Sequence, residues 1–324
     1  MTSPVGRGSR SAGGSLRPLD DDWAATLLTA AAMAVAVASV ALHSNALAAL
    51  GLSLACLALY VHVMLARLCS YDPGLAQPLP KEVRTPIDVE RFIAHRDMAD
   101  GPVQMAAGSS IRWNGDYGSQ TELCVLYMHG WSASPRESEP VDVRVAQELR
   151  ANSLRFRLSG HGLCPLERAG QAMHRDATKH NMLRDMAEAF ACAKVLGKRV
   201  VVLSASTGST LALWLCAQPW ARAQRDIVAV VAISPALSLR APTYPIIKWL
   251  VALLPATASE LVLTLAVGST RRLRVLSEDY KRTWTTVYPS AAGRHAMCAR
   301  PATPLPHASR LSSRLLCSLS CGVQ

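Results

Sequence analysis

The sequence predicts an α/β fold with a mostly parallel sheet, a helical lid over it, and a transmembrane helical hairpin in front of it. Strands and helices alternate along the second half of the chain, which is typical of a parallel sheet covered on both faces. The apolar runs that predict strands lie at 124–128, 154–158, 200–203 and 227–233, and helix-like stretches lie near 141–150, 180–196 and 208–218. The hairpin is predicted by two long uncharged apolar runs near the N-terminus.

The N-terminal region divides into a tail and two apolar runs. Residues 1–22 are rich in Gly, Ser and Arg and then become acidic, which is typical of a disordered tail. Residues 23–42 carry no charge, and at roughly 1.5 Å per residue such a helix crosses a hydrocarbon core of about 30 Å. A second uncharged run covers residues 46–65. We therefore expect a membrane hairpin over residues 23–68, and a single signal anchor is the alternative.

Basic residues flank the hairpin on both sides, which predicts the side of the membrane on which its ends lie. Cytoplasmic flanks of membrane helices carry an excess of Lys and Arg. The flanking basic residues here are Arg7, Arg10, Arg17, Arg67, Lys81 and Arg84. We therefore expect both ends, and the domain that follows, on the cytoplasmic side of an inner or plasma membrane.

The remaining chain is assigned to a linker, a domain and a tail. Residues 69–91 contain four prolines and are predicted to be a linker. The α/β domain is expected over residues 92–280, with one or two additional strands within 92–115 and the helical lid at about 241–270. Residues 281–324 are expected to form a basic tail of atypical composition, without clear strand alternation from Ser290 onward.

Composition excludes several classes of function. The net charge is +11, but the basic residues are scattered and no basic patch is interleaved with aromatic residues, so we expect no nucleic-acid partner. A membrane surface with anionic head groups suits this charge at least as well. The nine cysteines form no CxxC pair, so we expect no metal site and buried free thiols in a reducing compartment.

The strongest motif surrounds Ser206. The apolar run that begins at Val200 leads directly into Ser204-Ala205-Ser206-Thr207-Gly208, and a helical pattern follows at once. A tight strand-to-helix turn of this kind needs small residues two positions before and after the central serine, whose side chain then projects above the carboxyl end of the sheet. Ser204 stands where glycine is usual. Ser206 is therefore the candidate nucleophile, and the alternative is an ordinary serine in a turn.

Two further loops follow predicted strands. Cys124–Met128 leads into His129-Gly130-Trp131, and the run from Arg155 ends in Ser-Gly-His161-Gly. Acyl transfer needs two N–H groups directed at the oxyanion, and these usually come from the residue after the nucleophile and from such a loop. We therefore expect the backbone N–H groups of Thr207 and Trp131 to form an oxyanion hole.

Together these motifs resemble the α/β-hydrolase family, and within it the branch of bacterial carboxylesterases, monoacylglycerol lipases and lysophospholipases. That branch has the same order of a strand-HG loop, an R-x-x-G-H-G turn and a strand-G-x-S-x-G elbow, and the resemblance covers about residues 105–240. It implies hydrolysis of carboxylic esters through an acyl-enzyme on Ser206, with no metal or organic cofactor. It also implies supporting roles in the loops for His129, Gly130, Gly208 and His161.

The acid and base that such an enzyme needs are not recognisable. In this family they follow the nucleophile in the order Asp or Glu, then His. Asp226 is expected at the wrong edge of the sheet, and no Asp or Glu follows Asp279. His295 and His307 follow no credible strand. We therefore expect a changed reading frame near Pro289 or a truncated gene, which would leave the 227–233 strand as an exposed sheet edge.

The sequence thus predicts a serine hydrolase that acts on a carboxylic ester, with lipid-derived acyl esters among the candidate substrates, near a membrane. The alternative is a catalytically inactive, membrane-tethered module that binds a lipid or a protein. A peptidase or a thioesterase on the same scaffold is a third reading, and acyl-chain length and oligomeric state stay open.

Overall fold

A computed structural model describes residues 73–76, 78–237, 256–274, 278–294 and 316–319, together with Ala38, Cys56, Tyr60, Val251 and Leu254. The chain divides into two compact units, Met1–Arg67 and Leu68–Gln324. The expected hairpin at 23–68 lies almost entirely outside the described residues. Within the described residues, no helix has both the length and the apolar character needed to span a membrane.

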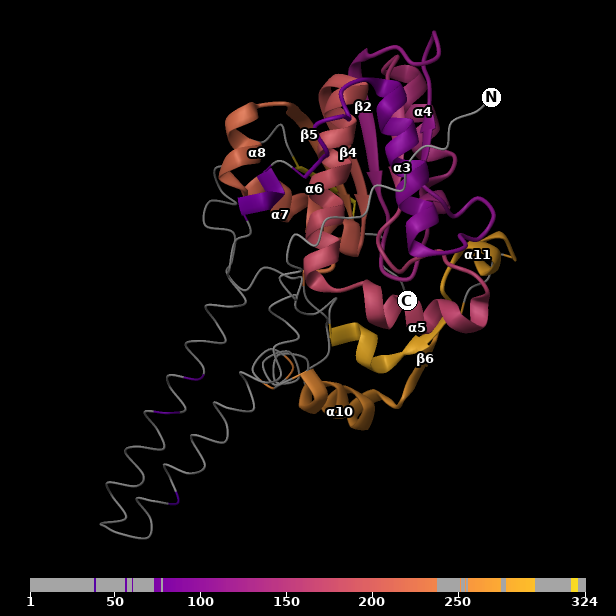
Figure 1. Cartoon of the computed structure of the whole chain (residues 1–324), viewed down its shortest axis with the longest axis vertical. Helices are drawn as coiled ribbons and strands as arrows, with labels where there is room; N and C mark the ends of the chain where they lie inside the picture. Colours follow the sequence, from indigo (N-terminus) through magenta and orange to yellow (C-terminus); the bar gives the residue numbers. More distant parts are fainter. Residues whose placement is uncertain are drawn as a thin grey trace, which may run out of the picture. The chain divides into compact units, whose positions relative to one another are not determined.

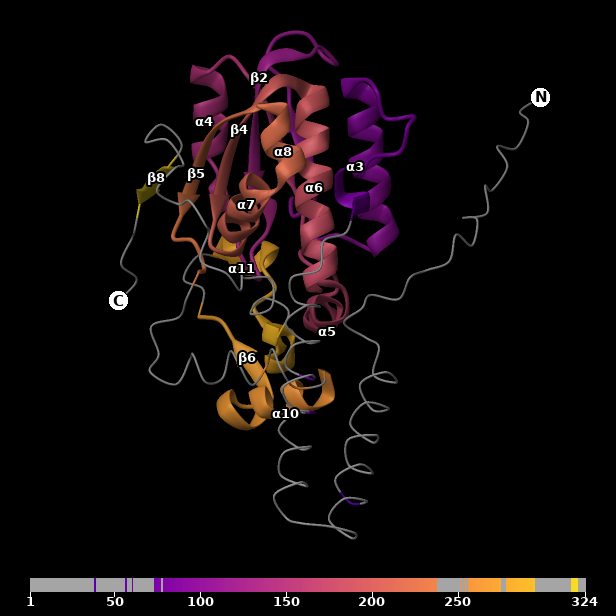
Figure 2. The same ribbon diagram turned by 90° about the vertical axis from the view of Figure 1, so that its left-hand side faces the viewer.

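The second unit contains a six-stranded, mostly parallel sheet in the order β1-β3-β2-β4-β5-β8 (Figures 1 and 2). Only β1 is antiparallel to its neighbour. The strands are β1 (Ser110–Arg112), β2 (Thr121–Met128), β3 (Asn152–Phe156), β4 (Gly197–Ala205), β5 (Ile227–Ile233) and β8 (Leu316–Leu319). The α/β class and the four strands expected between residues 124 and 233 are thus confirmed.

Helices cover both faces of this sheet, as the alternation of strands and helices predicts. Figure 2 shows α4 on one face and α3 and α6 on the other. The helices of this unit are α3 (Pro86–Asp100), α4 (Val141–Glu148), α5 (Leu166–Asp176), α6 (Lys179–Leu196), α7 (Thr207–Ala217) and α8 (Pro219–Gln224). The helices expected near 141–150, 180–196 and 208–218 are α4, α6 and α7.

Successive residues of the central strands pack into two different cores. In β4, Val200 and Val202 face the core formed with α3, α6 and α7, whereas Val201 and Leu203 face the core formed with α4. Each of these four valine and leucine side chains is buried. Both faces of the strand are therefore apolar, which explains why β4 appears in the sequence as a continuous apolar run.

Helix α3 begins at Pro86, inside the range assigned from the sequence to a linker. Thr85 caps the helix through a capping box with Asp88, and Pro86 occupies the first turn. A proline in the first turn has a suitable φ and lacks an N–H that would have no partner there. The linker assignment was therefore wrong for residues 86–91, and the 92–115 region contains one described strand, β1, after this helix.

The C-terminal part contains one helix where the sequence predicts a helical lid, and further elements that the sequence does not predict. The helix α10 (Ala256–Val267) lies in the expected lid region, of which residues 241–250 are not described. After it come β6 (Thr270–Arg272), α11 (Glu278–Thr283), β7 (Val287–Pro289) and a short helical turn, η4 (Ser290–Ala292). β6 and β7 pair with each other as an antiparallel two-stranded sheet. The assignment of 281–324 to a tail was therefore wrong for the described residues 281–294 and 316–319.

Strand β5 is not the edge of the sheet. Val230–Ile233 pairs in parallel with Leu316–Leu319, so β8 lies beside β5. The expectation that 227–233 forms an exposed sheet edge is therefore wrong for Val230–Ile233. The expectation was wrong because residues 316–319 show no alternating pattern, and their strand conformation depends on pairing with a distant strand.

Candidate active site

Ser206 occupies the sharp corner between β4 and α7. Its backbone has φ 48° and ψ −112°, a combination that L-residues rarely adopt. Its N–H donates to the carbonyl of Ile233 (2.9 Å), and its carbonyl accepts from the N–H groups of Thr210 and Ala236 (both 3.2 Å). Strain of this kind costs about 1–3 kcal/mol and persists where the surrounding structure fixes it. The turn predicted from the sequence is therefore present, and the end of β5 holds it.

The residues two positions before and after Ser206 explain how this corner closes. The side chain of Ser204 is buried and donates to the carbonyl of Val231 (3.1 Å), so serine fits where glycine is usual. A Cβ atom on Gly208 would lie 2.2 Å from the carbonyl oxygen of Met128 and 2.6 Å from that of His129. Only glycine therefore lets α7 approach the end of β2 this closely.

The same close approach brings the His129-Gly130-Trp131 loop to Ser206. A Cβ atom on Gly130 would lie 3.2 Å from the Cβ atom of Ser206. Within the described residues, neither the N–H of Trp131 nor that of Thr207 donates a hydrogen bond. Both amide donors thus lie in segments that meet at Ser206. Their convergence on one oxyanion stays a prediction.

The ring of His129 holds this loop in place. The N–H of Leu158 donates to Nε2 of His129 (3.0 Å), so Nε2 carries no proton and Nδ1 donates to the carbonyl of Gly130 (2.8 Å). Burial, followed by the nearby His161 ring, lowers the pKa of His129 well below its ordinary value, so the ring is neutral. Because the Gly130 carbonyl and the Trp131 N–H lie on opposite sides of one trans peptide, this bond also orients that N–H.

Glu137 holds the other side of Gly130, and the sequence analysis missed it. Its carboxylate accepts from the N–H of Gly130 (2.8 Å) and from the hydroxyl of Tyr127 (2.9 Å). Burial raises the pKa of Glu137 above its ordinary value, and the hydrogen bonds from Gly130 and Tyr127 oppose that shift. A glutamate seven residues after a His-Gly pair gives no local signal, because its role depends on the 3-10 helix η3 (Pro135–Ser138) turning back.

His161 and Trp131 lie in one aromatic cluster beside this loop. The ring of His161 packs edge-on against Trp131, with centroids 5.4 Å apart, and against His129 at 5.2 Å. The ring of Tyr288 also packs edge-on against Trp131, with centroids 6.2 Å apart. Burial lowers the pKa of His161 to about 4, and its Nδ1 lies 3.0 Å from the carbonyl of Ser159. His161 is therefore a neutral ring within the loop structure, and its supporting role stays a prediction.

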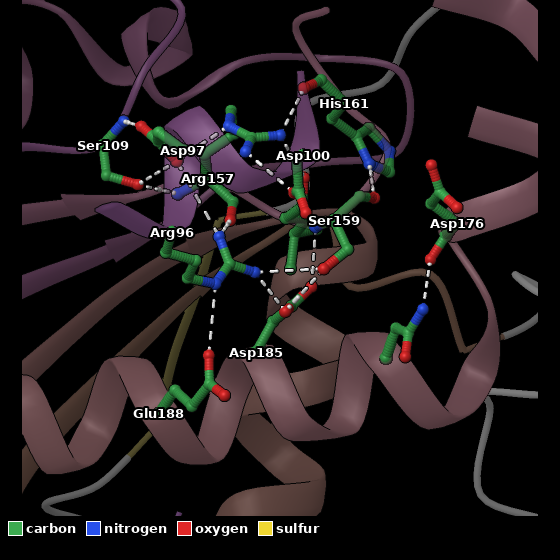
Figure 3. Close-up of polar contacts among 12 residues, drawn as sticks. Arg96, Asp97, Asp100, Ser109, Arg157, Ser159, His161, Asp176, Asp185 and Glu188 are labelled. Carbon is green, nitrogen blue, oxygen red and sulfur yellow. Dashed lines mark hydrogen bonds and ion pairs between the residues drawn. The ribbon is translucent and has the colours of Figure 1, made fainter. Parts of the chain in front are cut away.

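A buried network of charges fixes the loop that carries His161 (Figure 3). Arg157 is fully buried and donates to Asp97 (3.0 Å), to Asp100 (2.8 Å) and to the carbonyl of His161 (2.9 Å). Arg96 donates to the Arg157 carbonyl (2.8 Å) and pairs with Asp185 of α6. Since Arg96, Asp97 and Asp100 all belong to α3, that helix anchors the loop.

The general base and acid are not among the described contacts of the site. Within the described residues, no histidine and no carboxylate hydrogen-bonds the Ser206 hydroxyl, whereas Asp226 precedes β5 and pairs with Lys194 (2.9 Å). His295 and His307 lie outside the described residues.

Among the described residues, no group of three or more His, Cys, Asp or Glu side chains could hold a metal ion. Cys56, Cys124, Cys164, Cys192 and Cys216 are free thiols.

Comparisons with known proteins gave similarities in structure but none in sequence. No protein-family model matches the sequence, and no curated protein matches it. One of two metagenome-derived lipolytic enzymes, LipS and LipT, is similar in structure, with 17% identity over 61% of this chain and 69% of its own, and a TM-score of 0.45.

Two other solved structures resemble the chain over similar or shorter spans. Est1E from Butyrivibrio proteoclasticus, with ferulic acid bound, is 19% identical over 40% of this chain and 49% of its own (TM-score 0.29). A soluble variant of monoglyceride lipase from Saccharomyces cerevisiae, with a substrate analogue, is 13% identical over 59% and 64% (TM-score 0.33). This chain thus spans about half the length of the Butyrivibrio protein, and TM-scores this low carry no conclusion about activity.

Proposed function

We propose that this chain is a serine hydrolase of the α/β-hydrolase type, in which Ser206 attacks the carbonyl carbon of a carboxylic ester. The observation that carries this proposal is the corner at Ser206, with φ 48° and ψ −112° between β4 and α7 and with Gly130 against it. A strained strand-to-helix turn that presents a serine at the carboxyl end of a parallel sheet is the geometry in which this nucleophile works.

In the proposed reaction, the Ser206 oxygen forms a bond to the acyl carbon while its proton passes to a general base, and the alcohol then leaves. Water later hydrolyses the acyl-enzyme and releases the acid. The N–H groups of Trp131 and Thr207 stabilise the charge that develops on the carbonyl oxygen. Loss of one such donor typically lowers the rate by about 10²–10³.

The second candidate function is a catalytically inactive module that binds a lipid or a protein. It is favoured by one observation, that among the described residues no histidine hydrogen-bonds the hydroxyl of Ser206. A serine without a base is a poor nucleophile at neutral pH. The two candidates differ in whether the purified chain turns over an ester.

Hydrolysis of short and long p-nitrophenyl esters tests the proposal. Ser206→Ala is expected to abolish turnover by the purified chain. Ser119→Ala is a matched control, because Ser119 is an exposed serine in the turn before β2, and it should leave the rate unchanged. No turnover by a folded native chain would favour the inactive module, whereas equal turnover by the native chain and Ser206→Ala would contradict Ser206 as the nucleophile. Thioester and peptide substrates in the same assay test the third possibility, a thioesterase or a peptidase on the same scaffold.

The proposal extends to the location of the enzyme. The two apolar runs within residues 23–68 support a membrane hairpin that tethers the hydrolase domain to the cytoplasmic face of an inner or plasma membrane. A substrate derived from a lipid would suit this position. Membrane fractionation with protease protection tests it, and recovery of the full chain in the soluble fraction would oppose it.

A further inference from the structure

A cavity of about 560 Å³ lies at the β1 edge of the sheet and contains none of the residues of the proposed catalytic site. It is formed by the segment that precedes β1, by residues of β1 and β3, and by the loop that follows β2. Pockets of about 300–1,000 Å³ are typical of small-molecule sites. The side chains that line this cavity are mainly polar, so it suits a polar ligand better than an acyl chain.

Three guanidinium groups in this cavity converge on one carboxylate. Glu139 lies 3.0 Å from Arg136, 3.3 Å from Arg112 and 3.5 Å from Arg155. Arg155 is also paired with the buried Asp142, through bonds of 2.6 and 2.9 Å. Asp142 thus balances Arg155, and Arg112 and Arg136 share the single charge of Glu139. One positive charge is left in excess among these five groups.

Arg112 and Arg136 also have N–H groups to spare. A guanidinium group carries five N–H donors in a fixed planar arrangement that matches the oxygen atoms of a phosphate or a carboxylate. In the part of the chain that the structure describes, each of the two arginines contacts an acceptor only at Glu139, through one nitrogen. Their side chains are 54% and 41% exposed, so an oxyanion has access to them.

From this arrangement we infer that the cavity binds a small, water-soluble organic anion. Arg112 and Arg136 hold its phosphate or carboxylate group. The site is separate from Ser206, so its ligand is not the ester that is hydrolysed. Binding forms no covalent bond.

Calorimetric titration of the full chain with glycerol 3-phosphate tests this inference, with inorganic phosphate and glycerol as partial ligands. The double variant R112Q/R136Q is expected to bind glycerol 3-phosphate at least about tenfold more weakly, because it removes the charge-assisted hydrogen bonds. The double variant K198Q/R199Q is the matched control. Lys198 and Arg199 are likewise exposed and share one carboxylate, Glu122, at 3.1 and 3.4 Å, and their loss should leave the affinity unchanged.

Should R112Q/R136Q fail to fold, the single variant Arg136→Gln gives the same comparison with a smaller loss. Absence of millimolar binding by the native chain, or an equal loss in both double variants, overturns the inference.

Discussion

The carboxylate of Glu137 accepts a 2.8 Å hydrogen bond from the backbone N–H of Gly130, the residue that packs against Ser206. On the other side of the same glycine, His129 donates to the Gly130 carbonyl at 2.8 Å. The two peptide groups that meet at Gly130 are therefore fixed by one acidic and one aromatic side chain. Glu137 is thus a positioning residue for the Trp131 N–H in the proposed reaction.

Replacing Glu137 by alanine should lower kcat by about tenfold or more while KM stays within about twofold. The reason is that the loop would lose its anchor and the Trp131 donor would act mainly on the transition state. Glu137→Gln keeps an amide oxygen that accepts from Gly130 and should recover most of the rate. Steady-state kinetics with a p-nitrophenyl ester measure both variants. Equal kcat values for Glu137→Ala and the native chain would exclude this role.

Gly208→Ala should destabilise the fold and remove activity together. Its Cβ atom would lie 2.2 Å from the Met128 carbonyl, so α7 must shift away from β2, which costs about 1–3 kcal/mol. Gly293→Ala is the matched control, since nothing lies within 4 Å of a Cβ there. Urea denaturation gives both free energies of unfolding. Similar stabilities for the two variants would show that α7 and β2 are not packed as described.

Arg157→Lys should lower the free energy of unfolding by about 3 kcal/mol. Lysine cannot reach Asp97, Asp100 and the His161 carbonyl at once, so the buried Asp97 and the partly exposed Asp100 lose hydrogen bonds (Figure 3). Arg175→Lys is the control, because Arg175 pairs with Asp176 and its side chain is 71% exposed. It should change the free energy of unfolding by less than about 1 kcal/mol. Thermal or urea unfolding distinguishes them, and an equally small loss in both would contradict a structural role of the network.

Stability should fall as the pH drops from about 6.5 to about 4. Burial lowers the pKa of His161 to about 4 in the folded chain, so between these values the unfolded chain binds the extra proton. The contribution of this histidine is present above pH 6.5, and its loss over the window is on the order of 3 kcal/mol. The free energy of unfolding, measured in urea at pH 7 and at pH 5, should therefore differ less between the two pH values in His161→Gln than in the native chain. An identical difference in the variant would show that His161 is not buried as a neutral ring.

The sequence predicts the sheet and the Ser206 corner because both depend on local pattern. Strand β4 is apolar on both faces, and the corner needs small residues at 204 and 208, which the sequence displays directly. Helix α3 was missed because Pro86 signals either a linker or a first helical turn, and only the Thr85 cap decides between them.

Contacts between distant segments explain the other differences. The N–H of Thr285 donates to the carbonyl of Ser132 (2.8 Å), and a Cβ atom on Gly170 would lie 2.3 Å from the Val287 carbonyl. These contacts join residues 283–289 to the loop beside Ser206 and to α5. Neither contact leaves a pattern in its own segment. Composition alone therefore made this part of the chain resemble a tail.

Labelling with a fluorophosphonate probe, followed by peptide mapping, tests directly whether Ser206 is an activated nucleophile. The probe forms a covalent bond to the oxygen of a serine that has a working base and oxyanion hole. The proposed function predicts one labelled peptide, which contains Ser206 and which disappears in Ser206→Ala but not in Ser119→Ala. A folded native chain that remains unlabelled at Ser206 would contradict it.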